Sequence, residues 1–161
     1  MDKGTYGRRD RLVKEKRHDP YMEREKWPDP TLCTECGALF TGGRWTWQRP
    51  PEKVNRALCP ACQRTRDRLP AGTIELSGDF LQDQRDEIMN LIKNQEKMEK
   101  TERPVERIME IKEENGKLTI LTTGIHVARR IGEAIFRAYQ GEFDFSYGDG
   151  EKTIQVRWHR D

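Results

Sequence analysis

Long apolar runs are missing from this sequence, and apolar residues of any kind are scarce. Hydrophobic residues make up 34% of the 161-residue chain and charged residues make up 36%, which is too polar for one core running through the whole length. No stretch is long enough to span a bilayer, and none near the N-terminus has the form of a signal peptide. We therefore expect a cytoplasmic protein that does not enter a membrane.

The motifs of common enzyme classes are missing as well. The three histidines, His18, His126 and His159, have no partner at the spacing of a metal site or a catalytic triad. The chain has no phosphate-binding G-x-x-x-x-G-K-[ST] loop, no dinucleotide fingerprint and no G-x-S-x-G motif. These absences predict a non-catalytic protein with no small-molecule substrate.

The few cysteines form two close pairs. Cys33 and Cys36 make one C-x-x-C pair, Cys59 and Cys62 make the other, and 22 residues separate the pairs. In a reducing compartment this pattern indicates a metal site and not disulfides. Four thiolates at this spacing can surround one Zn²⁺ as a tetrahedron. We predict one structural Zn²⁺ held by these four cysteines.

Three other roles for the cysteines compete with a structural zinc site. Redox-active C-x-x-C pairs usually follow a strand at the start of a helix, and two pairs together argue against that role. A catalytic zinc keeps an open coordination position, which four cysteine ligands do not leave. Iron in a four-thiolate site is chemically possible and stays open at this stage.

Charge and composition divide the chain into three predicted parts. Residues 1–70 carry 16 basic and 10 acidic side chains, a net charge of +6, whereas residues 71–161 carry a net −4. Residues 1–30 contain almost nothing that could form a core and are expected to be a basic flexible arm. Residues 31–70 are expected to form a zinc ribbon with a Leu39–Trp47 hairpin, and residues 71–161 an α+β domain.

Periodicity gives the elements expected in residues 71–161. Apolar residues at helical spacing predict two helices. The first runs from about Asp79 to Lys100, and its apolar stripe is Leu81, Ile88, Leu91, Ile92 and Met98. The second covers His126–Tyr139, and its expected buried residues are Val127, Ile131, Ala134, Ile135 and Ala138. The remaining expected segments are a short connecting strand at Thr73–Leu76, two strands flanking the hairpin turn Asn115-Gly116, and two alternating strands around Phe143–Tyr147 and Ile154–Trp158. This order predicts an αββαββ domain, ferredoxin-like or KH-like, with both helices on one face of the sheet.

Basic and aromatic residues in the first half of the chain are candidates for binding RNA. Arginine pairs with phosphates and stacks on bases, and tryptophan offers a stacking surface. The candidates are Arg8, Arg9, Arg11, Lys14 and Arg17 in the arm, and Arg44, Trp45, Trp47, Arg49, Arg64, Arg66 and Arg68 in and after the ribbon. Two plainer interpretations stay open. In the first, the arm is an ordinary solubilising tail. In the second, Trp45 and Trp47 only cover the ribbon core, and their i,i+2 spacing places them on one strand face.

Several runs of the sequence resemble a bacterial zinc-ribbon family. They are Leu32–Phe40, Gly42–Trp45, Ala57–Cys62, Pro70–Thr73, Ile125–Ala134 and Ala138–Glu142. The zinc-binding part of that family is similar to the N-terminal part of the nonsense-mediated-decay-three family, the export adaptor of the large ribosomal subunit. The resemblance implies that the four cysteines are the metal ligands and that the partner is the ribosome or its RNA. A bacterium has no nuclear export, so only ribosome binding carries over, with a stress or hibernation-type role as a further implication.

Two other functions compete with ribosome binding. One is a zinc-dependent protein–protein adaptor that docks through its acidic C-terminal domain. The other is DNA binding, which needs a helix that presents arginines to a major groove. Neither predicted helix is basic enough for that role.

Overall fold

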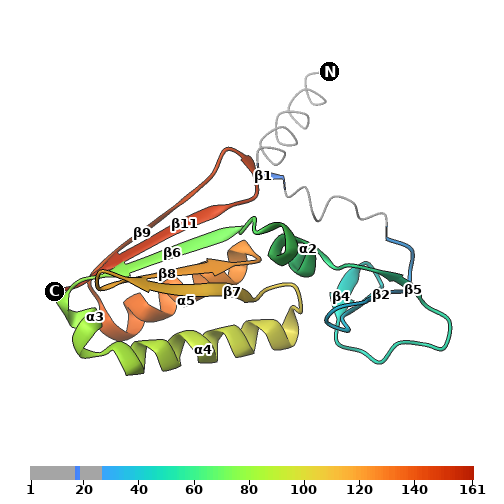
Figure 1. The fold of residues 1–161 in the computed structure, drawn as a ribbon, viewed down its shortest axis with the longest axis horizontal. Coiled ribbons are helices and arrows are strands. Elements are labelled where there is room, and N and C mark those ends of the chain that lie inside the picture. The colour runs from blue at the N-terminus through green and yellow to red at the C-terminus, as the bar shows by residue number, and fades with distance from the viewer. Residues whose placement is uncertain (1–16, 19–26) are drawn as a thin grey trace, which may run out of the picture.

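The computed structural model describes residues 17–18 and 27–161, which form a small ribbon beside a larger α+β domain (Figure 1). Most of the predicted basic arm, including Arg8, Arg9, Arg11 and Lys14, lies outside the described residues. Arg17 belongs to the two-residue strand β1 (Arg17–His18), which pairs in parallel with β10 (Gly150–Glu151). This pairing joins residues 17–18, which precede the ribbon in the sequence, to residues 150–151 of the α+β domain.

The ribbon is a four-stranded sheet of very short strands. They are β2 (Thr31–Cys33), β3 (Leu39–Thr41), β4 (Arg44–Thr46) and β5 (Asn55–Ala57), in the order β4-β3-β2-β5. Gly42 and Gly43 both have positive φ and form the β3–β4 turn, which glycine allows without steric cost. The ribbon's core holds five buried residues, two of which are cysteines: Cys33, Ala38, Trp45, Cys59 and Ala61.

A helix that the sequence pattern did not predict follows the ribbon. Helix α2 (Pro60–Asp67) begins directly after Cys59 and ends at Arg68, whose φ of 57° is left-handed. Pro60 occupies the first helical position, where its missing N–H has no consequence. The second cysteine pair therefore lies at a helix start and not in a second free-standing loop.

The α+β domain contains a five-stranded sheet and three helices. The strands are β6 (Gly72–Ser77), β7 (Ile108–Glu114), β8 (Lys117–Thr122), β9 (Glu142–Tyr147) and β11 (Ile154–His159), in the order β7-β8-β6-β11-β9. The helices are α3 (Asp79–Asp83), α4 (Arg85–Glu102) and α5 (Ile125–Tyr139). Of the described residues, no helix is long and apolar enough to cross a membrane.

The element order differs from the predicted αββαββ pattern because β6 is a full strand at the centre of the sheet. It pairs in parallel with β11 and in antiparallel with β8. Ile74 and Leu76 are completely buried, whereas Thr73 and Glu75, which alternate with them, are only partly buried. The prediction treated these residues as a connector because the apolar alternation is short. The domain therefore has one strand more than a ferredoxin-like βαββαβ unit.

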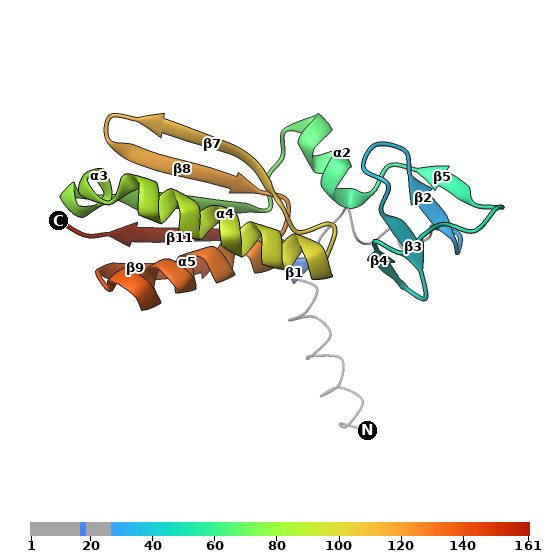
Figure 2. The same ribbon diagram turned by 90° about the horizontal axis from the view of Figure 1, so that it is seen from below.

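Helices α4 and α5 lie on the same face of the sheet (Figures 1 and 2). Val127, Ile131 and Ile135 of α5 pack completely buried against the strands. Two predicted core residues are corrected, since Met98 is 58% exposed and Ala138 is exposed at the end of its helix. The expected single first helix is interrupted at Gln84, whose φ and ψ of −113° and 26° are not helical.

The Asn115-Gly116 turn between β7 and β8 is present, and both residues have positive φ, as a two-residue hairpin of this sequence requires. This turn joins β7 to β8, which pair in antiparallel, and β8 in turn pairs with β6.

Replacing Ile120 with Ala tests the position of the core. Ile120 is completely buried on β8, and we expect the free energy of unfolding to fall by about 2–5 kcal/mol because the lost methyl groups leave a cavity. Thr119→Ala on the opposite face of the same strand is the matched control and should cost less than about 1 kcal/mol. Urea denaturation followed by circular dichroism measures both, and equal losses would contradict the assigned core face.

Candidate metal centre

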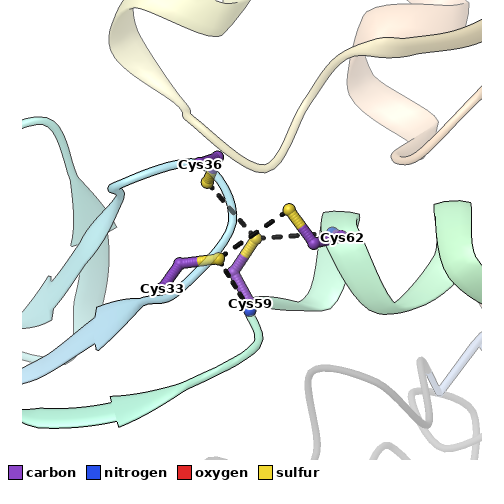
Figure 3. Close-up of side chains that lie close together, drawn as sticks. All are labelled: Cys33, Cys36, Cys59 and Cys62. Atoms are coloured by element: carbon purple, nitrogen blue, oxygen red, sulfur yellow. Dashed lines mark hydrogen bonds between the residues drawn. The ribbon is translucent and has the colours of Figure 1, made fainter.

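The first cysteine pair lies at the end of β2, where Cys33 is the last strand residue, and in the tight loop that follows it. The N–H of Cys33 donates to the carbonyl of Ala38 at 2.8 Å, and the N–H of Gly37 donates to the carbonyl of Cys33 at 3.1 Å. Gly37 has a φ of 83°, a left-handed conformation that suits glycine. These bonds turn the chain back after Cys36, so that both side chains of the pair point to the same side (Figure 3).

The second pair is positioned by the start of α2. Cys59 is the N-cap residue, and its sulfur accepts the N–H of Cys62 at 3.4 Å. The N–H of Cys59 donates in turn to the sulfur of Cys33 at 3.3 Å. A helix start favours negative charge through its free N–H groups. Hydrogen bonds with Cys33 and Cys36 nevertheless raise the pKa of Cys59, and the N–H of Cys62 at the helix start opposes this effect.

The four sulfurs have the geometry of a metal site. The sulfurs of Cys33 and Cys62 are 3.8 Å apart, as are those of Cys36 and Cys59, and all four lie within 4.8 Å of one another. A disulfide would bring two sulfurs to about 2.0 Å. A tetrahedral ion with metal–sulfur distances of about 2.3 Å separates its ligands by about 3.8 Å. The four cysteines therefore fit one tetrahedral metal ion with no open position.

The titration of the cluster also favours a cation at its centre. Burial raises the pKa of the Cys62 thiol to about 11, and the charges of Cys36 and Cys33 add to this effect. Hydrogen bonds with Cys33 and Cys36 raise the pKa of Cys59, whereas hydrogen bonds with Cys36 and Cys59 lower the pKa of Cys33. The group cannot hold four thiolates by itself, but a divalent ion allows all four to ionise.

An arginine from the other domain completes the centre. Nη2 of Arg107 donates to the sulfurs of Cys36 at 3.1 Å and Cys59 at 3.4 Å, and Nη1 lies 3.7 Å from the sulfur of Cys62. Burial by itself lowers the pKa of Arg107. The sulfurs of Cys59 and Cys36 raise the pKa by more than burial lowers it, so the guanidinium stays charged. A dication held by four thiolates leaves a net negative charge, which Arg107 partly offsets.

Arg107 belongs to a rigid segment between α4 and β7, residues 103–107. Nε of Arg107 donates to the carbonyl of Pro104 at 2.7 Å, and its N–H donates to the hydroxyl of Thr123 at 2.9 Å. Val105 packs against the ribbon core. Independently, Nε1 of Trp47 donates to the carbonyl of Lys100 at 2.7 Å. The ribbon is thus fixed to the end of α4 and to segment 103–107.

The candidate RNA-binding residues of the ribbon and α2 separate into exposed and buried groups. Arg44, Trp47, Arg49, Arg66 and Arg68 are exposed, although Arg66 also forms an ion pair with Asp67 at 2.8 Å.

Two candidates are corrected because they are buried. Arg64 is 2% exposed and its Nη1 donates to the carbonyl of Leu69 at 2.7 Å. Trp45 is 5% exposed and packs on Trp27 and Phe40. Trp47 does not share the face of Trp45, because β4 ends at Thr46 and the strand alternation stops there.

Sequence motifs did not identify Arg107 or its neighbour Glu106. Arg107 lies 71 positions from Cys36 in the sequence, and no local motif marks it. Glu106 is buried, and its Oε1 accepts the N–H of Val127 at 2.8 Å at the start of α5. The pKa of Glu106 is raised to about 7, chiefly by burial, whereas its hydrogen bond from Val127 lowers it. The charge of Glu99 raises the pKa, and the charges of Lys152 and Arg103 lower it. Only the tertiary structure reveals either residue.

Comparisons of the chain with models of known protein families, with curated proteins and with solved structures give no match. The chemistry of the centre is therefore assigned from its own geometry.

Replacing Arg107 with Met tests its role at the centre. We expect the affinity for Zn²⁺ to fall about 10- to 100-fold, because the sulfurs lose their hydrogen-bond donors and the cation that offsets their charge. Competition with a chromophoric chelator measures the affinity. Arg85→Met removes an exposed arginine that pairs with Glu113 and should leave it unchanged. Unchanged affinity in Arg107→Met would show that the contact has no effect on the metal.

The pKa of Glu106 predicts a specific pH dependence of stability. Its folded value of about 7 exceeds its ordinary 4.5, so the folded state binds this proton more tightly. The resulting stability is fully present below about pH 4.5 and is lost as the pH rises through 7. Relative to Glu106→Gln, the metal-loaded wild type should lose about 1 kcal/mol between pH 6 and 8.5. Glu110→Gln, an exposed change on β7, is the control, and parallel curves for all three proteins would refute the prediction.

Proposed function

We propose that the chain is a non-catalytic, cytoplasmic, zinc-dependent RNA-binding protein whose partner is ribosomal RNA or the ribosome. The observation that carries the proposal is that the ribbon has buried and exposed side chains with different roles. Its cysteines and Trp45 face inward, whereas several of its arginines remain in solvent around the metal-held strands.

The assignment of zinc rests on the closed, all-sulfur donor set. Zn²⁺ has no redox chemistry and is commonly held by C-x-x-C pairs as a tetrahedral structural ion. Iron fits the same ligands, so elemental analysis of the purified protein is the discriminating measurement. With every ligand supplied by cysteine, the metal stabilises the fold and does not activate a substrate.

The exposed basic residues of the ribbon and α2 suit a polyanion. Residues 27–70 contain seven basic and four acidic side chains, and the exposed arginines are Arg44, Arg49, Arg56, Arg66 and Arg68. Arginine binds phosphate in a bidentate manner and stacks on bases. The basic residues of the arm precede this surface in the sequence and would extend it. A stress or hibernation-type role, such as occupying idle ribosomes, is proposed from the family resemblance.

A zinc-dependent protein adaptor is the second candidate. The face of the sheet opposite α4 and α5 is covered by no helix of the described chain (Figures 1 and 2), and Glu75, Asp144 and Arg157 are among its polar side chains. Such a surface suits a polar protein partner. Sedimentation with ribosomes separates the two functions, because an adaptor would stay at the top of the gradient at low salt.

Salt dependence tests the RNA-binding proposal. If about four arginine–phosphate contacts form, the affinity for ribosomes or structured RNA should fall roughly 100-fold between 50 and 200 mM salt. Changing Arg44, Arg49 and Arg56 together to Gln should weaken binding and flatten the salt dependence, as should deletion of residues 1–20.

The matched control changes Lys93, Lys97 and Arg137 to Gln. These residues are exposed on α4 and α5, so this variant has the same net charge as the ribbon variant. Equal losses in both would indicate a non-specific charge effect. Full binding at 200 mM salt by the ribbon variant would remove the ribbon from the RNA interface.

A further inference from the structure

A cleft of about 290 Å³ lies between the ribbon and the α+β domain, next to the start of α5. Phe40 of the ribbon and Val105 and Ile125 of the other domain contribute apolar walls. Ligand sites in proteins are commonly about 300–1,000 Å³ and mostly apolar with a few polar groups. The volume of this cleft therefore suits a small group and not an extended ligand.

One buried acid supplies the polar group of the cleft. Glu106 lines it and is 7% exposed. Its Oε1 accepts the N–H of Val127 at 2.8 Å, and within the described part of the chain Glu106 has no other hydrogen bond or ion pair. Oε2 is therefore available to a donor that enters the cleft, and an ionised carboxylate accepts hydrogen bonds but donates none.

Three cations and one further acid, Glu102, lie beside the buried acid in the lining of the cleft. Arg44, Arg103 and Lys152 line it, and Arg103 also pairs with Glu99 at 3.2 Å. A ligand that suits these groups combines a flat apolar body, a hydrogen-bond donor at its edge and a nearby negative charge. A nucleotide of a single-stranded RNA has all three, since its base stacks on apolar surfaces and its phosphates pair with arginine and lysine.

We infer that this cleft is a subsite for one unstacked nucleobase that carries an exocyclic amino group, with the neighbouring phosphates of the same RNA strand on the cationic rim. The inference rests on the proposed RNA-binding function and adds the chemistry of one contact. Cytosine offers its amino group to Oε2 of Glu106, as carboxylates accept from this group elsewhere. Uracil has a carbonyl in the same place, which a carboxylate repels.

Cytosine and uracil differ at that one group, so a pair of oligonucleotides tests the inference. Fluorescence anisotropy with labelled C6 and U6 is measured on the full, zinc-loaded chain at pH 8, where Glu106 is largely ionised. We expect C6 to bind about tenfold more tightly than U6. In Glu106→Gln the ratio should fall towards one while U6 binding is kept, and in the exposed control Glu110→Gln the ratio should stay as in the wild type.

The outcomes distinguish this inference from the RNA-binding function on which it rests. Equal binding of C6 and U6 by the wild type, or an unchanged ratio in Glu106→Gln, overturns the cleft while RNA binding stands. Absence of binding to either oligonucleotide and to ribosomes overturns both. Equal affinity for CMP and C6 would assign the cleft to a free nucleotide and overturn the assignment to an RNA strand.

A second measurement covers the case in which Glu106→Gln does not fold. In NMR spectra of the wild type, CMP should shift the backbone amide of Val127, which bonds to Glu106, more strongly than UMP does. Residues of the distant β7–β8 turn, such as Asn115, serve as the internal reference. No shift of Val127 at saturating CMP would overturn the inference without any variant.

Discussion

The cluster of four cysteine sulfurs, three of which accept hydrogen bonds from the guanidinium of Arg107, governs the arrangement of this molecule. The ribbon strands are three residues long each, too short to hold together by backbone pairing alone, and the ribbon buries few side chains. A metal ion bound by the cysteines supplies the missing folding free energy. Arg107 then joins that centre to the α+β domain by donating to three of the sulfurs, so that the metal also bears on how the ribbon is oriented.

The orientation of the ribbon has consequences for the surface. Segment 103–107 carries Arg107 toward the sulfurs and Glu106 toward the start of α5, so one short stretch serves both the metal centre and the cleft. Pro60, the residue after a metal ligand, also lines the cleft. The cleft exists because the two domains are fixed to each other, and loss of the metal would remove one of its walls.

The arginines and tryptophans of the ribbon illustrate how burial decides between structural and functional roles. Trp45 closes the small core and Arg64 stabilises the end of α2. Trp47 is half exposed but is held by its bond to Lys100. The remaining exposed arginines are the groups that an RNA strand would meet. Residues of one type that are close in the sequence, such as Arg64 and Arg66, therefore differ in burial and in what they contact.

By itself, the sequence determined the four ligands, the Asn115-Gly116 hairpin, the two long helices and the alternation of β9 and β11. Each of these depends on spacing within a short window, which local periodicity and ligand geometry report directly. The tertiary structure decided that β6 lies at the centre of the sheet, that Arg107 contacts the cysteine sulfurs and that Glu106 lines the cleft. These features arise from contacts between residues far apart in the chain, such as Arg107 with Cys36, for which no local pattern exists. The start of α2 is different, because Pro60 at the first helical position is a local signal that the prediction did not use.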